Sequence, residues 1–373
     1  MKLMTFARTA SLLALGVGIT ACTAEKPEGQ GPVEPDEVIC GVDNVEDMVS
    51  LPGTSWIIGS GIGGHFFQSG GLHLINEADS SASKAKLDLS PALKPQAPFD
   101  QCPGPAQAEL FSAHGLSLAA NAAGGHTLYA VNHGGRESIE VFDVQSAGGE
   151  PQLKWIGCIL TPDTAASNSV AARSDGSLVM SASGASDTPM PSFAEMAKQI
   201  KAGKKMGPMS SKGAVFTWSR SDGWKRVAGS ELEGNNGIEL SKDGKWVWNN
   251  SWPGSSVTHM PLDPALGKKR EVKLPFTPDN IRWSHDGKLV ATGHLASAEK
   301  VAACVMGGDA KACAIDYKAA EIDPDTYEVT ELYHARGTEK LGTATITLKT
   351  AKNLWVGSVS SKCIGRFALG QGK

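Results

Sequence analysis

The stretch Lys242-Asp243-Gly244-Lys245-Trp246-Val247-Trp248 is the clearest copy of a pattern that recurs along the chain. A small polar turn precedes a run of large apolar residues, and Asp-Gly between apolar runs is a strong hairpin signal. Five further copies begin their apolar runs at Trp56, Leu128, Leu178, Leu289 and Leu354. The six anchors are 72, 50, 68, 43 and 65 residues apart, which suits one four-stranded blade plus insertions. The pattern therefore predicts an all-β fold, a six-bladed β-propeller.

The composition agrees with a globular protein built from many short strands. The chain has 373 residues, of which 41% are hydrophobic and 20% charged, and these values exclude wholesale disorder. Its 43 glycines and 20 prolines are spread along the chain, as expected for strands joined by turns. The formal net charge is −4, so no basic excess indicates a nucleic-acid partner.

The N-terminus has the features of an export signal. Lys2 and Arg8 precede a short apolar run, and small residues follow it. We therefore interpret residues 1–21 as a signal peptide, since the run is too short to remain as a membrane-spanning helix. The following Ile-Thr-Ala-Cys22 resembles a bacterial lipobox, in which the cysteine is lipidated and becomes the new N-terminus. The alternative is an ordinary signal with an incidental cysteine.

A tether separates this signal from the folded domain. Residues 22–37 are rich in Pro, Gly and Glu, a composition typical of a linker, and the propeller is expected at 38–371. We expect an exported protein in the bacterial cell envelope, held by its lipid at the outer membrane and facing the periplasm. Its oligomeric state is open from the sequence.

The cysteines agree with export. Besides Cys22 the chain has six, an even number that indicates disulfide bonds in an exported protein but allows 15 pairings. Cys304 and Cys313 make the simplest local pair, and no Cys-x-x-Cys suggests zinc. The six are Cys40, Cys102, Cys158, Cys304, Cys313 and Cys363.

A second regularity lies ten residues before four of the hairpin anchors. Side chains with oxygen atoms occupy this position or follow it directly. The strand before each hairpin turn should be the innermost of its blade, so these residues should converge at one mouth of the channel. They are Glu46, Asp47, Asn168, Asn236, Asp279 and Asn280. Carboxylate and amide oxygens suit Ca²⁺ better than zinc or Mg²⁺; the alternative is that Asn and Asp simply begin strands after turns.

Two histidines lie symmetrically about one predicted turn. His114 and His133 flank the turn at Ala123-Gly124-Gly125, so they should face each other across adjacent strands, at the same end as the metal. A histidine pair beside a metal can act as a general base. The alternative is two structural histidines that bond backbone carbonyls.

An insertion at 187–212 is expected to contain one short helix. Ser192 and Glu195 form a capping-box pair, apolar residues follow with helical spacing, and Gly203 can end the helix. It would form a lid over the site or pack on the rim, or its lysines would contact lipid headgroups.

The sequence motifs of nucleotide-binding proteins, serine hydrolases and zinc hydrolases are absent or incomplete. A G-x-G-x-x-G match at residues 59–64 lacks the helix that should follow it, so nucleotide binding is not expected. The chain has no G-x-S-x-G and no H-E-x-x-H, which argues against a serine nucleophile or zinc in a hydrolase.

Taken in order, these residues resemble the calcium-dependent paraoxonase/arylesterase family, within the senescence marker protein/gluconolactonase-like group. The similarity is collinear over roughly residues 38–368. The matching stretches are Val45-Glu46-Asp47, Ala113-His114-Gly115-Leu116, Tyr129-Ala130-Val131-Asn132-His133, Asn168-Ser169-Val170, Asn236-Gly237-Ile238, Asp279-Asn280-Ile281, Gly293-His294 and Trp355-Val356-Gly357.

The resemblance implies a specific site. His114 and His133 would form the base dyad, and a second, structural Ca²⁺ would lie near Asp47 and the Leu116 carbonyl. The family usually has Asp where this chain has Ser169, which should weaken that second ion or leave one Ca²⁺ only. The catalytic Ca²⁺ would be held by Glu46, Asn168, Asn236, Asp279 and Asn280.

The resemblance also implies a covalent closure and an activity. Cys40–Cys363 would join the first and last strands, which leaves Cys102–Cys158 once Cys304–Cys313 is paired. The implied function is a calcium-dependent hydrolase of lactones or aryl esters acting on a small-molecule substrate. The alternatives are a sugar lactonase or phosphotriesterase on the same scaffold, and an envelope-tethered binding module with structural Ca²⁺ and no turnover.

Overall fold

The computed structural model describes residues 1, 31–63, 70–146, 148–202, 204, 212–307 and 313–370. Apart from Met1, the predicted signal peptide lies outside the described residues, as do Cys22 and the tether as far as residue 30. Within the described ranges, no helix is long and apolar enough to cross a membrane.

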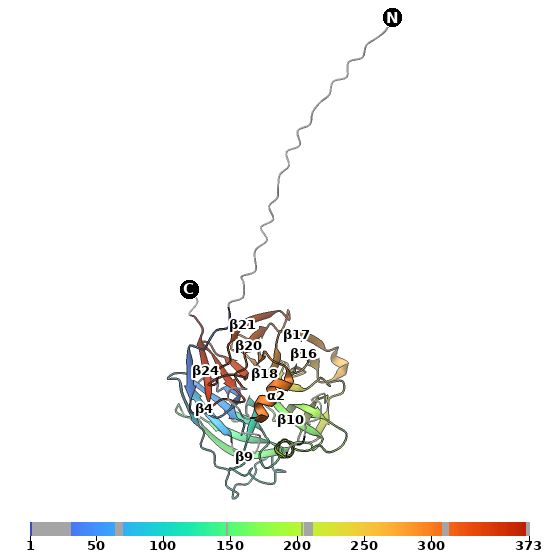
Figure 1. Cartoon of the computed structure of the whole chain (residues 1–373). Coiled ribbons are helices and arrows are strands. Elements are labelled where there is room, and N and C mark those ends of the chain that lie inside the picture. Colours follow the sequence, from blue (N-terminus) through green and yellow to red (C-terminus); the bar gives the residue numbers. More distant parts are fainter. Residues whose placement is uncertain are drawn as a thin grey trace. The chain divides into compact units, whose positions relative to one another are not determined.

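The described residues form six four-stranded antiparallel sheets, which confirms the predicted six-bladed β-propeller (Figure 1). The first blade contains β2 (Val45–Ser50), β3 (Trp56–Gly61), β4 (Gly71–Asn76) and β5 (Ser81–Lys84). The second contains β6 (Ala113–Ala120), β7 (His126–Asn132), β8 (Ser138–Gln145) and β9 (Gln152–Leu160). The third contains β10 (Ala165–Ala172), β11 (Leu178–Ala185), β12 (Ala214–Ser219) and β13 (Gly223–Arg226).

The remaining blades follow the same order. The fourth contains β14 (Asn235–Leu240), β15 (Trp246–Ser251), β16 (Ser256–Pro261) and β17 (Arg270–Lys273). The fifth contains β18 (Thr277–Trp283), β19 (Leu289–His294), β20 (Tyr317–Ile322) and β21 (Val329–Ala335). The sixth contains β22 (Ala344–Lys349), β23 (Asn353–Ser358), β24 (Cys363–Ala368) and, from the other end of the chain, β1 (Glu37–Cys40).

The sixth blade closes the ring. β1 pairs antiparallel with β24, and Cys40 lies opposite Cys363 in the register, where a disulfide bond joins them. The first and last blades therefore lie side by side, as the blue β4 and red β24 of Figure 1 show. The structure also contains the expected Cys102–Cys158 and Cys304–Cys313 bonds.

Two α-helices occur in the described part of the chain. α1 (Phe193–Lys201) agrees with the expected helix, and Ser192 Oγ caps it by accepting the Glu195 N–H at 3.1 Å. α2 (Ala298–Gly307) was not expected and corrects the single helical insertion. Its buried Val301 and Cys304 lie three residues apart, so a short apolar period was present in the sequence.

The first strand of each blade lies innermost, because it contacts the first strands of both neighbouring blades. All six of these strands contain a register shift near their start. A β-bulge bends a strand and re-aims its side chains. The strands also approach closely: a Cβ on Gly237 would lie 2.6 Å from the Asn280 Cα, and one on Gly115 would lie 2.5 Å from the Ser169 Cα.

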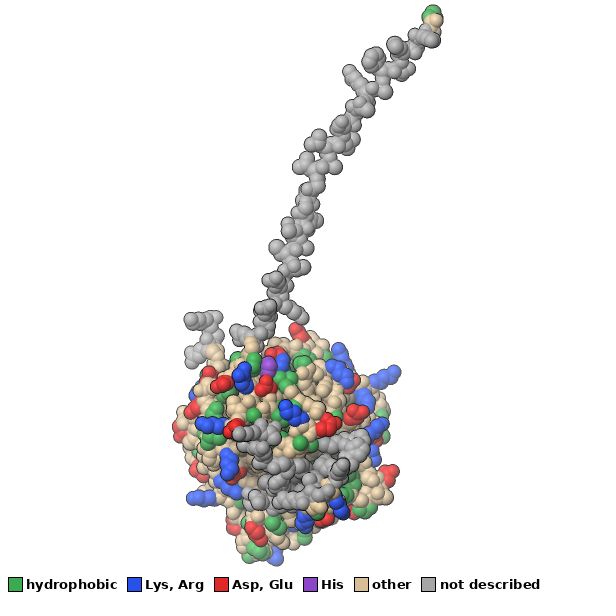
Figure 2. All heavy atoms as spheres, viewed as in Figure 1, with side chains coloured by type: hydrophobic (Ala, Val, Ile, Leu, Met, Phe, Trp, Pro, Cys, Tyr) green, Lys and Arg blue, Asp and Glu red, His purple; other side chains and the backbone are tan. Residues whose placement is uncertain are grey.

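Apolar side chains fill the space around and between the blades, with Trp155, Trp248 and Trp355 among the largest fully buried. On the face drawn in Figure 2, acidic and basic side chains are interspersed around the rim of the described surface. Neither sign gathers into a broad patch there, in agreement with the small net charge.

Candidate active site at the propeller axis

Five buried polar residues, here called the polar ring, occupy the bulges of four inner strands: Glu46, Asn168, Asn236, Asp279 and Asn280. The structure brings most of them into contact. Asn280 Nδ2 donates to Glu46 Oε1, and the Asn236 side chain lies close enough to Asp279 to oppose the rise in the pKa of that carboxyl. Thr345, in the bulge of β22, donates to the Glu46 carbonyl at 2.7 Å. Asn168 occupies the matching bulge of β10, with its carbonyl beside Gly115.

Three oxygen atoms of the polar ring are buried without a hydrogen-bond partner: Glu46 Oε2, Asn168 Oδ1 and Asn236 Oδ1. Buried acceptors are normally paired, and leaving one unpaired costs about 1–3 kcal/mol. A cation that accepts hard oxygen ligands would satisfy all three, so the residues fit Ca²⁺. The described residues include no group of three or more His, Cys, Asp and Glu placed to hold a metal; the polar ring has two carboxylates and three amides.

The electrostatics of the polar ring also favour a cation. Burial and the neighbouring Glu46 carboxylate raise the pKa of Asp279 well above its ordinary value. His294 Nε2 lies 3.7 Å from Asp279 Oδ2, while Trp252 donates its indole N–H to His294 Nδ1 at 3.2 Å. Nε2 therefore carries the imidazole proton, and burial lowers the pKa of His294 to about 4. A neutral histidine leaves the carboxylates without a balancing charge.

The two predicted histidines are in contact and belong to a longer chain of hydrogen bonds. His114 Nδ1 lies 2.8 Å from His133 Nε2, and His133 Nδ1 lies 2.7 Å from Glu137 Oε2. At the other end, His114 Nε2 lies 3.6 Å from Glu46 Oε1. The chain thus runs from Glu137 through both imidazoles to the polar ring.

The pKa values of Glu137 and His133 indicate which nitrogen of each imidazole carries a proton in this chain of hydrogen bonds. Hydrogen bonds and charge from His133, with the Phe193 N–H and Ser167 hydroxyl, hold the pKa of Glu137 below its ordinary value despite burial. Burial lowers the pKa of His133, against the opposing effect of Glu137. An ionised Glu137 accepts a hydrogen bond from the N–H at His133 Nδ1. His133 Nε2 then has no proton and accepts a hydrogen bond from His114 Nδ1. The lone pair of His114 then sits on Nε2, toward Glu46.

The start of α1 covers this histidine pair. The Phe193 ring centre lies 4.2 Å from that of His133 and 6.4 Å from that of His114. The Phe193 N–H donates to Glu137 Oε1 at 3.1 Å. One carboxylate therefore holds both His133 and the first residue of the helix. Of the expected lid, residues 203 and 205–211 lie outside the described part.

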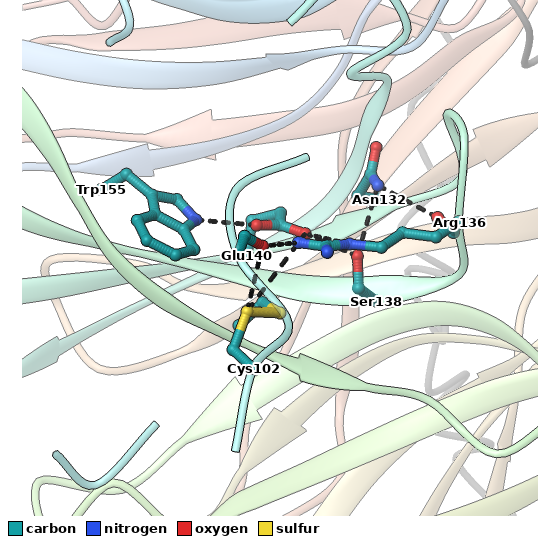
Figure 3. The surroundings of a disulfide bond; sticks show 8 residues. Cys102, Asn132, Arg136, Ser138, Glu140 and Trp155 are labelled. Carbon is teal, nitrogen blue, oxygen red and sulfur yellow. Dashed lines mark hydrogen bonds and ion pairs between the residues drawn. A yellow bond between two sulfur atoms is a disulfide. The ribbon is translucent and has the colours of Figure 1, made fainter. Parts of the chain in front are cut away.

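A second polar network supports the loop that carries His133 and Glu137 (Figure 3). Asn132 Nδ2 donates to the Arg136 carbonyl at 3.0 Å, which closes the loop. Arg136 pairs with the buried Glu140 at 2.7 Å and donates to the Gly104 carbonyl beside the Cys102–Cys158 disulfide. These hydrogen bonds and the ion pair restrict the positions of His133 and Glu137.

The groups expected to hold a second ion are both engaged by an arginine. Arg282 pairs with Asp47 and donates from Nη2 to the Leu116 carbonyl at 2.6 Å. Asp47 also accepts the Leu116 N–H at 2.7 Å. The sequence analysis did not single out Arg282, although it lies two residues after Asn280 on an inner strand.

Sequence reasoning also missed Glu137, and it gave His294 no role. Glu137 follows His133 by four residues, a weak signal because the intervening loop has no regular period. His294 ends β19, the strand next to the polar ring.

The comparisons with known proteins concern the fold. No family model and no curated protein sequence matches the chain. Among solved structures, a luciferin-regenerating enzyme is similar at 15% identity and a TM-score of 0.51, covering 92% of this chain and 96% of that one. A gluconolactonase from Xanthomonas campestris has 15% identity and a TM-score of 0.49, covering 88% and 86%. At such identities the likeness to the luciferin-regenerating enzyme shows the propeller fold alone, as the blades already indicated.

Proposed function

We propose that this protein is a calcium-dependent hydrolase of lactones or aryl esters. The observation that carries the proposal is the hydrogen-bonded chain Glu137–His133–His114, which ends beside a ring of buried oxygens that lack partners. The half-buried Glu137 orients His133, and the assigned protons leave the basic nitrogen of His114 on the side of the polar ring.

The polar ring would hold one Ca²⁺ through the oxygens of Glu46, Asn168, Asn236, Asp279 and Asn280. When bound, such an ion polarises the substrate carbonyl and stabilises the negative oxygen that develops in hydrolysis.

The chain's own residues handle the proton. His114 Nε2 takes a proton from the attacking water as the new carbon–oxygen bond forms. It returns this proton to the leaving oxygen when the original ester bond breaks. His133 accepts the hydrogen bond from His114, and Glu137 orients His133 and stabilises the positive charge that the pair gains.

Phe193 supports a substrate with an apolar part. Its ring packs against both imidazoles and limits the access of water to them. Esters with aryl groups, or lactones with an alkyl chain, would gain apolar contact at this position.

The test is hydrolysis by residues 23–373 of an aryl acetate and a panel of lactones, with Ca²⁺ and with a calcium chelator. We expect turnover that the chelator abolishes. The His114→Gln variant should lose turnover yet keep its calcium-dependent melting temperature. No turnover on any substrate, with Ca²⁺ still raising the melting temperature, would overturn the hydrolase and favour a binding module.

We further propose that the protein is exported and lipid-anchored through Cys22 at the outer membrane, facing the periplasm. Two features support the lipid anchor: the Ile-Thr-Ala-Cys22 sequence, and the basic residues followed by an apolar run that precede it. A Cys22→Ala variant should partition into the aqueous phase of a detergent extraction, whereas the wild-type chain should enter the detergent phase. Equal partition of the two would contradict the anchor.

A further inference from the structure

We infer that the guanidinium of Arg282 takes the place of a second cation in the channel, so the propeller carries one of its two central positive charges as a side chain. The inference holds whether or not the polar ring hydrolyses esters, because it concerns a different set of oxygens. We call this set the arginine cage: Arg282 with the carboxylates of Asp47 and Glu239 and the carbonyls of Met48 and Leu116.

The carboxylate and carbonyl oxygens of the cage are the kind of ligands found at a cation site. Arg282 donates to the Leu116 carbonyl at 2.6 Å, to Glu239 Oε1 at 3.0 Å and to the Met48 carbonyl at 3.3 Å, besides its ion pair with Asp47. These oxygens come from three blades, and β18, which carries Arg282, belongs to a fourth. A compact divalent ion would meet the same carboxylate and carbonyl oxygens, but the planar fork of the arginine already fills the space between them.

Because Asp47 is buried, its carboxylate needs a positive charge beside it. The side chains of Asp47 and Arg282 are 0% and 5% exposed, and an isolated buried carboxylate is strongly disfavoured. A guanidinium keeps its proton in proteins. Arg282 therefore places one positive charge between the two acids from within the fold.

Ser169 completes the argument. It lies against Gly115, the residue before Leu116, and its buried Oγ has no hydrogen-bond partner. A carboxylate at this position would add negative charge near the cage. With a neutral serine here, the cage contains two carboxylates and one guanidinium.

A cavity gives access to the cage from the other mouth of the channel. It has a volume of about 590 Å³ and is lined by Arg282 and Glu239, with Trp56 and Trp283 on its walls. An ion that replaced the guanidinium would therefore have a route from solvent that avoids the polar ring.

The first experiment counts the ions. Calorimetric titration with Ca²⁺ should give at most one ion per chain in the wild type. The Asp279→Asn variant, which disables the polar ring, should show no rise in melting temperature with added Ca²⁺. Two ions in the wild type, or a remaining calcium response in Asp279→Asn, would overturn the inference. Zero ions in the wild type would sink the proposed calcium site and leave Arg282 as the cation of the channel.

The second experiment restores a metal site. The double variant Arg282→Gln/Ser169→Asp should bind one Ca²⁺ more than the wild type, and its melting temperature should rise with Ca²⁺ by more than that of the wild type. Arg282→Lys, which keeps the charge, should fold without gaining an ion, and Arg220→Gln removes an exposed arginine as a control. A double variant that folds without gaining an ion would refute the inference. If it does not fold even in Ca²⁺, the Asp279→Asn result decides.

Discussion

Two sets of oxygens share the propeller axis, and they differ in what balances them. The polar ring presents three buried oxygens without partners, whereas the main acceptors of the arginine cage are bonded to Arg282. The two are adjacent in sequence: Glu46 belongs to the ring and Asp47 to the cage. The bulge of β2 contains both residues, and its altered geometry sends these neighbouring acids to different environments.

The difference teaches how to recognise a site for an external ion. A fold that buries acids must supply counter-charge, and the cage supplies it from a side chain. Where buried oxygens stay unpaired, a partner is expected from solution, as a water or an ion. The predictions below test this contrast, from the largest expected effect to the smallest.

Removing the internal cation should have the largest effect. Arg282→Leu leaves Asp47 and Glu239 buried without their partner, and breaking a buried pair in this way typically costs about 3–5 kcal/mol. Urea unfolding should show that loss, with a smaller one for Arg282→Lys. A change below about 1 kcal/mol in Arg282→Leu would mean that the cage does not depend on the guanidinium.

Loss of the proposed base should reduce turnover and leave the oxygens of the polar ring and of the arginine cage unchanged. His114→Gln should lower kcat by about 10²–10⁴-fold, the usual contribution of a general base. Calorimetry should show unchanged Ca²⁺ binding. Wild-type rates in this variant would contradict the base assignment.

The carboxylate behind the histidines should matter less, because it positions rather than reacts. Glu137→Gln keeps the shape of the side chain but removes its charge, and we expect a loss in kcat of about 10–100-fold, similar to other supporting groups behind a functional histidine. The acidic limb of the pH–activity profile, which reports deprotonation of the base, should also move to lower pH, since the neutral amide no longer favours a protonated histidine pair. Glu137→Asp should recover part of the rate. An unchanged pH profile would indicate that Glu137 has only a structural role.

The smallest expected effect is a pH dependence within the cage. Burial raises the pKa of Glu239 to about 6, with Arg282 acting in the opposite direction and Asp47 adding to the rise. A raised folded-state pKa favours the protonated fold, so this contribution is complete below pH 4.5 and is lost as pH rises through 6. Glu239→Gln should therefore match the wild type at pH 4.5 and be more stable at pH 8. Because the side chain is 18% exposed, the gain should stay under about 2 kcal/mol. A wild type that is the more stable of the two at pH 8 would show that the ion pair with Arg282 outweighs burial.

The sequence predicted the blades because the polar turn followed by an apolar run is a local signal, repeated six times, and three of its copies contain Asp-Gly. It also placed Glu46, Asn168, Asn236, Asp279 and Asn280 together, since the same phase in each blade means the same radius in the ring. Arg282 could not be assigned in this way. Its partner Asp47 lies 235 residues earlier, and nothing local marks an arginine on an inner strand as internal.

The bulges explain another gap between prediction and structure. They allow consecutive residues such as Asp279 and Asn280 to serve one site, which regular alternation would send to opposite faces. Glu137 escaped prediction because it lies in a loop whose shape depends on Asn132 and Arg136 rather than on any period.

The bond between Cys40 and Cys363 gives the molecule an unusual topology, since the backbone from one to the other and the disulfide together form a covalent macrocycle. A protease that cuts any one blade-to-blade loop within it would open this circle without releasing a fragment. The product would be two polypeptides joined by the Cys40–Cys363 disulfide, with two new ends at the cut. On a gel it would run as one chain until a reductant separated it into two. Integrity of the domain therefore does not depend on an uncut backbone.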